Sequence, residues 1–432
     1  MWVEVLCREV IGFMRQAARL ATGYTILMSF WVFALIGSGP ASAQTQGGYA
    51  DLFDAVWTVV AEQFAGTPKV DWDEVGRRYR DSVATAGSLE EAYLLMQQMV
   101  ALLGDSGTYL VTPAEVEQAR SNSDQSQIIG VGMLLESTPA GEVYIVDVLA
   151  RGPAARAGVR RGERIVAVDG ESTAGQSASE VASRIRGEQG KPVRITLADP
   201  QGQERTLEIV RAPVTFRSEF EAKTLPGRVG YISVPTLGSG SELQFLSALR
   251  RMYRTDALIV DLRRFDGVAD PEAVLKIAGL LTQEPLGAIL TRQGAFLLNP
   301  IREWGATGSI TVPPPTGLDY YRKPVAILVD ASVAVSPFSL AFVTGMQETG
   351  RATLVGRGTE PGAIYGGGQV YYELPGGGFL SVTANYLASI KSNTFVTQFQ
   401  PDVPVPVDRS YLAAWYRGDD ADVTAATAAL SR

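Results

Sequence analysis

Residues 323–369 read KPVAILVDASVAVSPFSLAFVTGMQETGRATLVGRGTEPGAIYGGGQ and carry the clearest fold signals in the sequence. Residues 325–329 form an unbroken apolar run, which is typical of a strand buried on both faces. Ser336 and Pro337 then place a hydroxyl at the N-cap and a proline at the first position of a helix. Gly350 suits the C-cap of this helix, and residues 352–355 indicate another strand. The stretch therefore predicts a strand–turn–helix–strand unit.

Serines gather at the start of this helix, and two interpretations of them compete. Backbone N–H groups and the helix dipole can stabilise a developing oxyanion there, which suits a nucleophile. A serine at an N-cap is also the common way to satisfy the first free N–H groups of a helix. The local pattern alone favours the capping role.

The same stretch resembles the nucleophile segment of the carboxyl-terminal processing peptidases, which are tail-specific Ser/Lys proteases with a PDZ domain. The corresponding pieces are Val329-Asp330, residues 332–339, residues 347–352, Val355-Gly356 and Gln369. This resemblance, which spans about residues 48–408, implies a multidomain α/β protein with a ClpP/crotonase-like peptidase core. It also implies a serine nucleophile and a lysine general base.

The sequence lacks this lysine where the family carries it. Counted back from Gln369, the position falls on Tyr365, and counted forward from the end of the helix it falls on Gly362. A Ser/Lys protease needs a lysine amine that burial keeps neutral near pH 7. The departure predicts a degenerate active site. The alternative is a relocated base, for which the candidates are Lys276, Lys323 and Lys391.

The position of the nucleophile is also open. Alignment from the strand places it on Val335, alignment from the helix end places it on Pro337, and Ser336 lies between them. With Ser336 as nucleophile, the following proline offers no N–H to an oxyanion, a loss that typically costs about 10²–10³ in rate. Ser339 is the alternative nucleophile and would lie inside the helix.

Residues 213–408 alternate strands and helices, which predicts an α/β core with right-handed crossovers. By resemblance, the backbone of Gly267 donates to the oxyanion, and Gln369 belongs to the catalytic set. Residues 297–321 lack periodicity and are interpreted as an irregular insertion, a candidate cover for the active-site face. Residues 409–432 indicate a C-terminal helical tail.

Residues 126–212 combine short apolar strands with glycine turns, and residues 152–170 closely resemble the PDZ domains of these peptidases. A PDZ domain captures the C-terminus of a protein as an added strand, with loop N–H groups holding the carboxylate. The resemblance implies this role for Gly130, Val131, Gly132 and Met133. The alternative is that these glycines only allow a tight bend before the strand.

Residues 44–125 carry apolar residues at helical spacing in three segments, which predicts a small helical bundle. Ser88 and Glu91 predict a capping box for the third helix. The segment resembles the family's N-terminal domain, except that Gly107 stands where relatives often carry histidine.

Residues 1–43 have the pattern of a secretory signal, with Met14 as an alternative start. The apolar run at 24–36 is shorter than the ~20 residues of a spanning helix, and small residues at 41–43 suit cleavage before Gln44. The pattern predicts a periplasmic or secreted protein; a retained membrane anchor is the alternative.

The composition excludes several kinds of chemistry. The sequence contains no histidine, and Cys7, its one cysteine, lies in the expected signal. Ser-His-Asp triads, cysteine nucleophiles and His/Cys zinc sites are therefore excluded from the mature protein. We see no calcium-loop spacing and expect no cofactor. A formal net charge of −8 without a long basic run argues against a nucleic-acid partner.

Three functions remain open at this point. The first is a proteolytically impaired peptidase homologue that binds protein C-termini through its PDZ domain and serves as an adaptor or regulator of an envelope protease. The second is an active serine endopeptidase with a relocated base. The third is a structural envelope protein whose PDZ groove is closed. The partner and the oligomeric state do not follow from the sequence.

Overall fold

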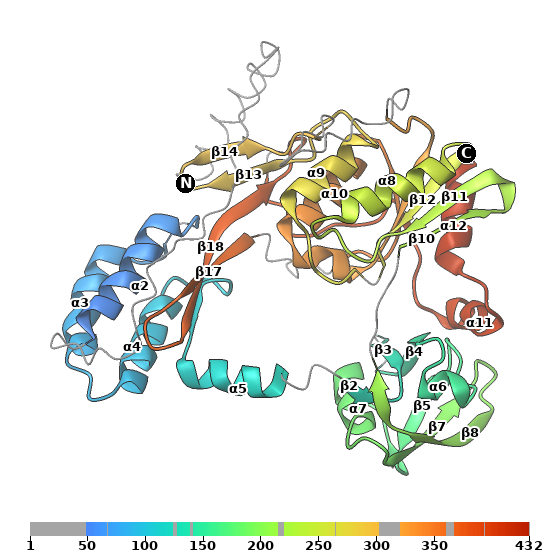
Figure 1. The fold of residues 1–432 in the computed structure, drawn as a ribbon, viewed down its shortest axis with the longest axis horizontal. Helices are drawn as coiled ribbons and strands as arrows, with labels where there is room; N and C mark the ends of the chain where they lie inside the picture. Colours follow the sequence, from blue (N-terminus) through green and yellow to red (C-terminus); the bar gives the residue numbers. More distant parts are fainter. Residues whose placement is uncertain are drawn as a thin grey trace. The chain divides into compact units, whose positions relative to one another are not determined.

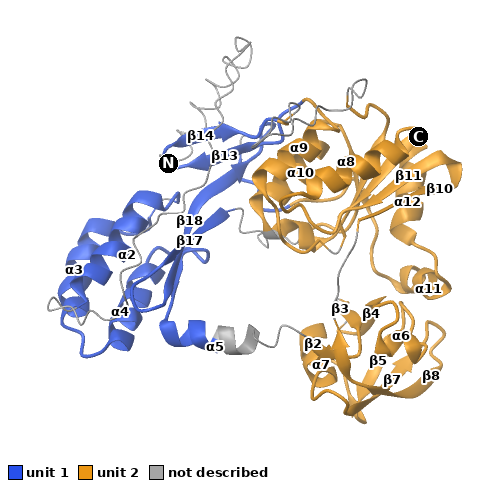
Figure 2. Ribbon diagram, viewed as in Figure 1, with its two compact units in different colours: residues 1–120, 284–299, 361–398 blue, residues 121–283, 300–360, 399–432 orange. Residues whose placement is uncertain are grey.

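The computed structural model describes residues 49–66, 68–123, 128–138, 141–214, 220–263, 265–301, 320–359, 367–392 and 394–431. The expected signal, Tyr365 and Gly362 lie outside the described residues, as do residues 302–319 of the expected insertion. The protein divides into two compact units (Figure 2). Unit 1 comprises Met1–Arg120, Glu284–Asn299 and Pro361–Gln398, and unit 2 comprises Ser121–Gln283, Pro300–Glu360 and Phe399–Arg432.

Unit 1 packs three helices against a twisted antiparallel sheet (Figure 1). The helices are α2 (Ala50–Gln63), α3 (Trp72–Ala84) and α4 (Leu89–Ala101), and α5 (Pro113–Ser123) follows them. The strands are β1 (Tyr109–Val111), β13 (Ala288–Thr291), β14 (Gly294–Leu297), β17 (Gly367–Glu373) and β18 (Phe379–Ala388). The helices share one core with Leu110, Leu380 and Val382 of the sheet. The expected helical bundle is therefore incomplete by itself, because its apolar faces are buried against strands that come much later in the sequence.

The helix starts of unit 1 follow the predicted capping pattern with one difference. Ser88 accepts a hydrogen bond from the Glu91 N–H (3.1 Å), as expected. The Glu91 carboxylate, however, accepts from the N–H of Gly87 instead of Ser88 (2.8 Å), so only half of the capping box forms. Asp71 caps α3 by accepting from the Glu74 N–H (3.0 Å).

The first part of unit 2 contains a six-stranded sheet, a separate two-stranded sheet and two short helices. Its elements are β2 (Ile128–Gly130), β3 (Met133–Ser137), β4 (Val143–Val148), α6 (Pro153–Arg156), β5 (Arg164–Val168), β6 (Glu171–Ser172), α7 (Ala178–Ile185), β7 (Pro192–Ala198), β8 (Glu204–Val210) and β9 (Ala212–Val214). The sheet order is β3-β4-β5-β7-β8, with β6 paired to β5. Strand β3 therefore lies at an edge of the sheet and can pair with an added strand.

The second part of unit 2 is a mostly parallel sheet in the order β10-β11-β12-β15-β16-β19. Its strands are β10 (Glu221–Leu225), β11 (Val229–Ser233), β12 (Ala257–Asp261), β15 (Val325–Val329), β16 (Thr353–Gly356) and β19 (Val403–Pro404). Its helices are α8 (Ser241–Met252), α9 (Pro271–Gly279), α10 (Pro337–Glu348), α11 (Arg409–Arg417) and α12 (Ala421–Leu430). Two short 3₁₀ turns, η1 (Pro226–Arg228) and η2 (Ala331–Val335), complete it. The predicted strand–turn–helix–strand unit is confirmed as β15, η2, α10 and β16.

Helices cover both faces of this parallel sheet. On one face, Tyr231, Ile259 and Leu328 share a cluster with Ala426 of α12. On the other face, Gly230 of β11 lies so close to Met252 of α8 that an added Cβ would contact it. Helix α9 contacts both α8 and α10. The expected C-terminal tail is therefore part of the core, because α12 supplies the layer that buries one side of the sheet. Among the described residues, no helix has the length and apolar character needed to cross a membrane.

Candidate active site

The carboxyl ends of β11, β12, β15 and β16 meet at one edge of the parallel sheet. Open α/β sheets bind ligands outside this edge. Ser336 follows β15 and Gly267 follows the neighbouring β12, so the structure brings these two predicted residues to the same edge. Gln369 belongs to unit 1, where it sits in β17 opposite Thr383.

Ser336 is the N-cap of α10, and its hydroxyl serves the helix. Its Oγ accepts a hydrogen bond from the N–H of Phe338 (3.3 Å), and its backbone is extended. Pro337, at the first helical position, has no N–H. The first N–H available at this helix start is thus bonded to the serine itself, which leaves a poor arrangement for an oxyanion.

Ser339, the alternative nucleophile, is fully buried within α10. Its Oγ lies 2.7 Å from the carbonyl oxygen of Val333 and 3.0 Å from that of Ser336, and its proton is directed at these acceptors. A substrate could reach this hydroxyl only if the first turn of the helix opened.

The structure also shows a serine–carboxylate pair that the sequence analysis did not single out. Asp330, directly after β15, accepts hydrogen bonds from both the N–H and the Oγ of Ser332. The Asp-x-Ser spacing at a strand end is a typical turn signal and could have revealed it. This hydrogen bond directs the Ser332 hydroxyl toward Asp330, within the same turn.

Gly267 adopts a backbone conformation that suits glycine, with φ +86°. The loop around it is fastened to the segment after β11: Asp266 N–H donates to Pro235 O (2.9 Å), and Asp270 N–H donates to Leu237 O (2.9 Å). Among the described residues, the Gly267 N–H has no hydrogen-bond acceptor. This loop is compatible with the expected role as an oxyanion donor.

Two of the three candidate lysines have other partners. Lys323 donates to the carbonyl oxygens of Tyr253 (3.0 Å) and Thr255. Lys323 precedes β15 and Ser336 follows this strand, so the two residues lie at opposite ends of the parallel strands. Lys276 forms an ion pair with Glu272 on α9 (2.7 Å). Lys391 belongs to unit 1.

The loop before β3 turns two of its backbone carbonyls toward neighbouring segments. The Val131 carbonyl accepts from Ala154 N–H (2.8 Å), and the Gly132 carbonyl accepts from Leu149 N–H (2.9 Å). In a trans peptide the N–H points opposite to the C=O, so the N–H groups of Gly132 and Met133 face away from these partners. Gly132 has φ +83°.

Helix α7 lies beside the edge strand β3. The N–H of Ala178, at the start of α7, donates to Ser137 Oγ at the end of β3 (2.7 Å). Val181 is buried in the core that Met133 and Leu135 contact. The edge of β3 therefore lies next to α7, with Met133 and Leu135 packed against the apolar core of this domain.

Comparison with known proteins agrees with this architecture. Residues 228–405 match the model of peptidase family S41, and residues 144–199 match that of the PDZ domain. The protein is 29% identical over 329 residues to a carboxyl-terminal-processing protease of Picosynechococcus sp., covering 73% of each protein. Residues 228–405 belong to peptidase family S41. The resemblance noted from the sequence is thereby confirmed, and the PDZ domain precedes the S41 domain.

Two further similarities extend this S41 assignment. The protein is 26% identical to carboxyl-terminal-processing peptidase 3, chloroplastic, of Arabidopsis thaliana, across 80% of its own length and 67% of that protein. The solved photosystem II D1 C-terminal processing protease aligns with a TM-score of 0.52 at 21% identity, covering 83% of this protein and 93% of that one. The predicted fold class, with N-terminal helices, a PDZ domain and an α/β peptidase core, is confirmed.

A buried charge network joins the strand ends of the S41 domain to its C-terminal helices. Arg263 contacts three carboxylates through its guanidinium: Asp261 (2.6 Å), Asp420 (2.9 Å) and Asp422 (2.6 Å). Arg357 pairs with the same Asp422 (3.1 Å). The sequence analysis missed this network, because Arg263 and Asp422 are far apart in the sequence.

Two tyrosines complete the hydrogen bonds of this network. Tyr231 donates to Asp261 (2.7 Å), and Tyr411 donates to Asp422 (2.7 Å). Burial opposes the charge on Arg263, but the adjoining Asp261 carboxylate outweighs it and holds the Arg263 pKa above its ordinary value. For Asp420, burial acts to raise the pKa, and the hydrogen bond from Arg263 more than reverses this, so the Asp420 pKa is lowered.

The lowered pKa of Asp420 predicts a pH-dependent contribution to stability. An unfolded aspartate titrates near about pH 3.9, so the folded state gains stability from this carboxylate above that pH and loses it as the pH falls through the lower folded pKa. We expect Asp420→Asn to reduce the free energy of unfolding by about 1–2 kcal/mol at pH 7, with the difference shrinking below about pH 4. Urea unfolding at a series of pH values measures both quantities.

A matched control for this prediction is Asp419→Asn. Asp419 pairs with Arg417 at the surface, where both side chains are 62% exposed. Exposed pairs contribute little, so this variant should stay within about 0.5 kcal/mol of the parent. A penalty for Asp420→Asn that is unchanged at pH 3 would contradict the assignment.

Proposed function

We propose that this protein is an S41 homologue that binds the C-termini of other proteins through its PDZ domain and has an impaired hydrolytic centre. One contrast supports the proposal. The loop before β3 presents backbone N–H groups beside an open strand edge, whereas the Ser336 hydroxyl is bonded to its own helix and is followed by Pro337.

In the proposed binding mode, an extended peptide pairs with the edge of β3, and its terminal carboxylate accepts from the N–H groups of Gly132 and Met133. Hydrogen bonds to a charged carboxylate are about twice as strong as neutral ones. The last residue of the peptide packs beside the partly buried Leu135, which contacts the core around Val181. The ligand class is therefore a free C-terminus with an apolar last residue.

We expect Met133→Glu to weaken binding of such a peptide by at least about tenfold, since it places a negative charge beside the bound carboxylate. Fluorescence anisotropy with a labelled peptide ending in apolar residues measures this. The same peptide with an amidated end should bind weakly to the parent. Val210→Glu, an exposed apolar-to-acid change in the same domain, is the matched control and should leave binding unchanged. Equal binding of acid and amide would reject the proposed mode.

The proposed impairment follows from the chemistry of a Ser/Lys site. The lysine takes the serine proton as the oxygen attacks the scissile carbonyl, and N–H groups stabilise the resulting oxyanion. Here, no lysine occupies the family position in the sequence, and Pro337 removes a donor next to Ser336. A general base contributes about 10²–10⁴ in rate and one oxyanion donor about 10²–10³.

We therefore expect no cleavage of an unfolded protein with an apolar C-terminus above the background of Ser336→Ala or Ser339→Ala. Product formation is followed by mass spectrometry over hours. A parent activity that disappears in either serine variant would establish the alternative, an active serine endopeptidase with a relocated base. Replacing Lys276, Lys323 and Lys391 singly with methionine would then identify the base.

The location forms part of the proposal. The signal pattern in residues 1–43 supports a periplasmic or secreted protein, and the PDZ domain supports a role as adaptor or regulator for an envelope protease. Mass spectrometry of the protein recovered from producing cells tests this, with Gln44 expected as the mature N-terminus. An intact N-terminus in the cytoplasmic fraction would contradict it.

A further inference from the structure

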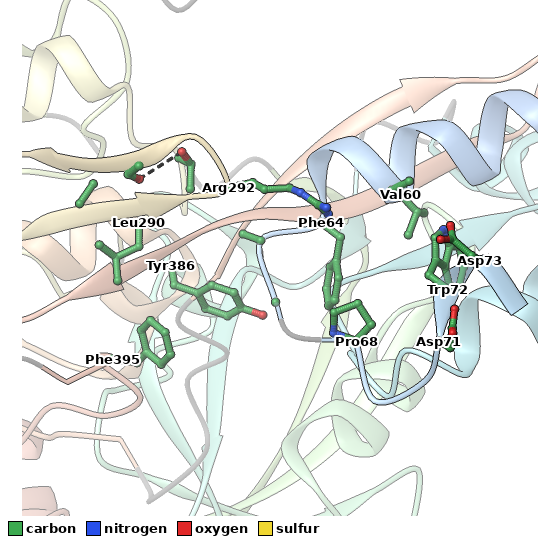
Figure 3. A pocket seen from close by; sticks show the side chains of 16 residues that line it. Val60, Phe64, Pro68, Asp71, Trp72, Asp73, Leu290, Arg292, Tyr386 and Phe395 are labelled. Carbon is green, nitrogen blue, oxygen red and sulfur yellow. Dashed lines mark hydrogen bonds between the residues drawn. The ribbon is translucent and has the colours of Figure 1, made fainter. Parts of the chain in front are cut away.

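A cavity of about 450 Å³ lies within unit 1 and contains none of the candidate catalytic or PDZ residues (Figure 3). Small-ligand sites usually measure about 300–1,000 Å³, so its size suits a small organic group. Three segments line it: the segment from α2 to the start of α3, the β13–β14 hairpin and the second half of β18.

The course of β18 explains why this space exists. Its first half packs against α2, α3 and α4, whereas its second half pairs with β13. Ala65 N–H donates to Thr383 O (2.9 Å), which fastens the loop after α2 to the middle of the strand. The loop and the hairpin thus both border β18 near Tyr386. The cavity is the space that remains between them.

Aromatic rings form much of the cavity wall. Phe64 and Trp72 come from the segment after α2, and Tyr386 and Phe395 come from β18 and the residues after it. Figure 3 shows Tyr386 pointing toward the loop that carries Phe64 and Pro68. The Tyr386 and Phe395 rings contact each other with centroids 5.1 Å apart. The indole N–H of Trp72 is already bonded to Trp57 O (3.2 Å), so its ring offers an apolar surface.

Such a wall favours an aromatic ligand. Aromatic pairs prefer tilted or offset arrangements at about 4.5–7 Å and gain energy beyond simple burial. The aliphatic residues at the edge of the cavity, such as Leu290 and Val60, add further apolar contact.

The charges at the cavity select the polar end of the ligand. Asp71 caps α3, and Asp73 lies in its first turn, where the helix dipole stabilises acidic side chains. Arg292, at the tip of the β13–β14 hairpin, has no hydrogen-bond or ion-pair partner among the described residues. In Figure 3 its side chain reaches over the cavity toward Phe64. The cation at the Phe64 end of the cavity is therefore Arg292, whereas Figure 3 places the carboxylates of Asp71 and Asp73 beside Trp72.

We propose that this cavity binds an aromatic group that carries a carboxylate, with the ring against Phe64 and Tyr386 and the carboxylate paired with Arg292. A free aromatic acid and an aromatic residue at a peptide C-terminus share this chemistry. The proposal stands independently of the function proposed for the PDZ and serine sites.

Calorimetric titration of the purified protein tests the ligand class with three indoles that differ in charge. Indole-3-acetate should bind with a dissociation constant on the order of 0.1–1 mM, typical for a ligand of this size. The neutral indole-3-acetamide should bind about tenfold more weakly, and the cationic tryptamine more weakly still. Equal affinities of acid and amide, stronger binding of tryptamine, or no binding of the acid would overturn the proposal.

Substitutions at the cavity test whether the ligand binds there. Arg292→Gln should weaken binding of indole-3-acetate until its affinity equals that of indole-3-acetamide. The affinity for indole-3-acetamide should not change. Arg77→Gln, an exposed arginine on α3 that does not line the cavity, is the matched control and should change neither. Ala295→Leu places a larger side chain in the cavity and should weaken both ligands by at least about fivefold. Acid binding that survives both Arg292→Gln and Ala295→Leu would show that the ligand binds elsewhere.

Two further measurements secure the interpretation. Thermal unfolding checks that each variant is folded. If Ala295→Leu does not fold, the affinities of Arg292→Gln for the acid and the amide still test the proposal. A short peptide ending in tryptophan, as acid and amide, separates the two ligand sources in the Met133→Glu background, where PDZ binding is suppressed. Binding of the peptide acid that depends on Arg292 assigns a peptide C-terminus, and binding of indole-3-acetate alone assigns a free aromatic acid.

Discussion

Arg263→Met is expected to lower the free energy of unfolding by about 3–5 kcal/mol. The Arg263 side chain is only 6% exposed, and that of Asp422 is fully buried. Removing the guanidinium leaves Asp261, Asp420 and Asp422 close together with Arg357 as the one remaining cation of the network. The cost arises mainly from buried carboxylates that have lost their partner. Urea unfolding followed by circular dichroism measures the change.

Arg228→Met provides the matched control for this variant. Arg228 also pairs with an aspartate, Asp256 (2.8 Å), but its side chain is 68% exposed. Water screens such a pair, so we expect only a small fraction of the loss that Arg263→Met causes. Similar effects of the two substitutions would show that the network at Arg263 contributes no more than a surface pair.

Gly356→Ala is expected to destabilise the S41 domain by more than about 3 kcal/mol and to disturb the end of β15. Gly356 has φ +130°, and an added Cβ would lie 2.3 Å from the Val329 carbonyl oxygen of the neighbouring strand. That oxygen belongs to the backbone, so it cannot move without shifting the turn that carries Asp330. Unfolding in urea gives the stability change, and hydrogen exchange of the turn reports the local disturbance.

Gly350→Ala separates the two causes in this prediction. Gly350 also has a positive φ, +69°, but an added Cβ there would meet no atom within 4 Å. Its cost should be limited to the left-handed backbone, about 1–2 kcal/mol. If Gly356→Ala costs no more than Gly350→Ala, the close contact with Val329 is not important.

The parts of the fold that depend on neighbouring residues could be predicted from the sequence. The apolar run at 325–329, the Ser336-Pro337 start and the glycine at 350 each act within one turn or strand. The same kind of local signal predicted the glycine turns of the PDZ domain. The candidate serine was predictable because a helix N-terminus is both a capping site and an oxyanion site.

The features that join distant segments could not be predicted in this way. The Arg263 network and the cavity at Tyr386 depend on tertiary packing, which brings together residues far apart in the sequence. Local periodicity indicated that the N-terminal helices have apolar faces but not that Leu380 and Val382 cover them. It likewise described residues 409–432 as a tail, although α12 completes the core.

The three-segment construction of unit 1 has a consequence for how the protein folds as it is made. Helix α4 ends at Ala101, but the strand that covers these helices, β18, begins at Phe379. At about 5–20 residues per second, a ribosome takes roughly 15–60 s to synthesise the residues between them. During that interval the apolar faces of α2, α3 and α4 lack their strand partner. The nascent polypeptide is therefore most prone to aggregate, and most dependent on chaperones, until β18 has been synthesised.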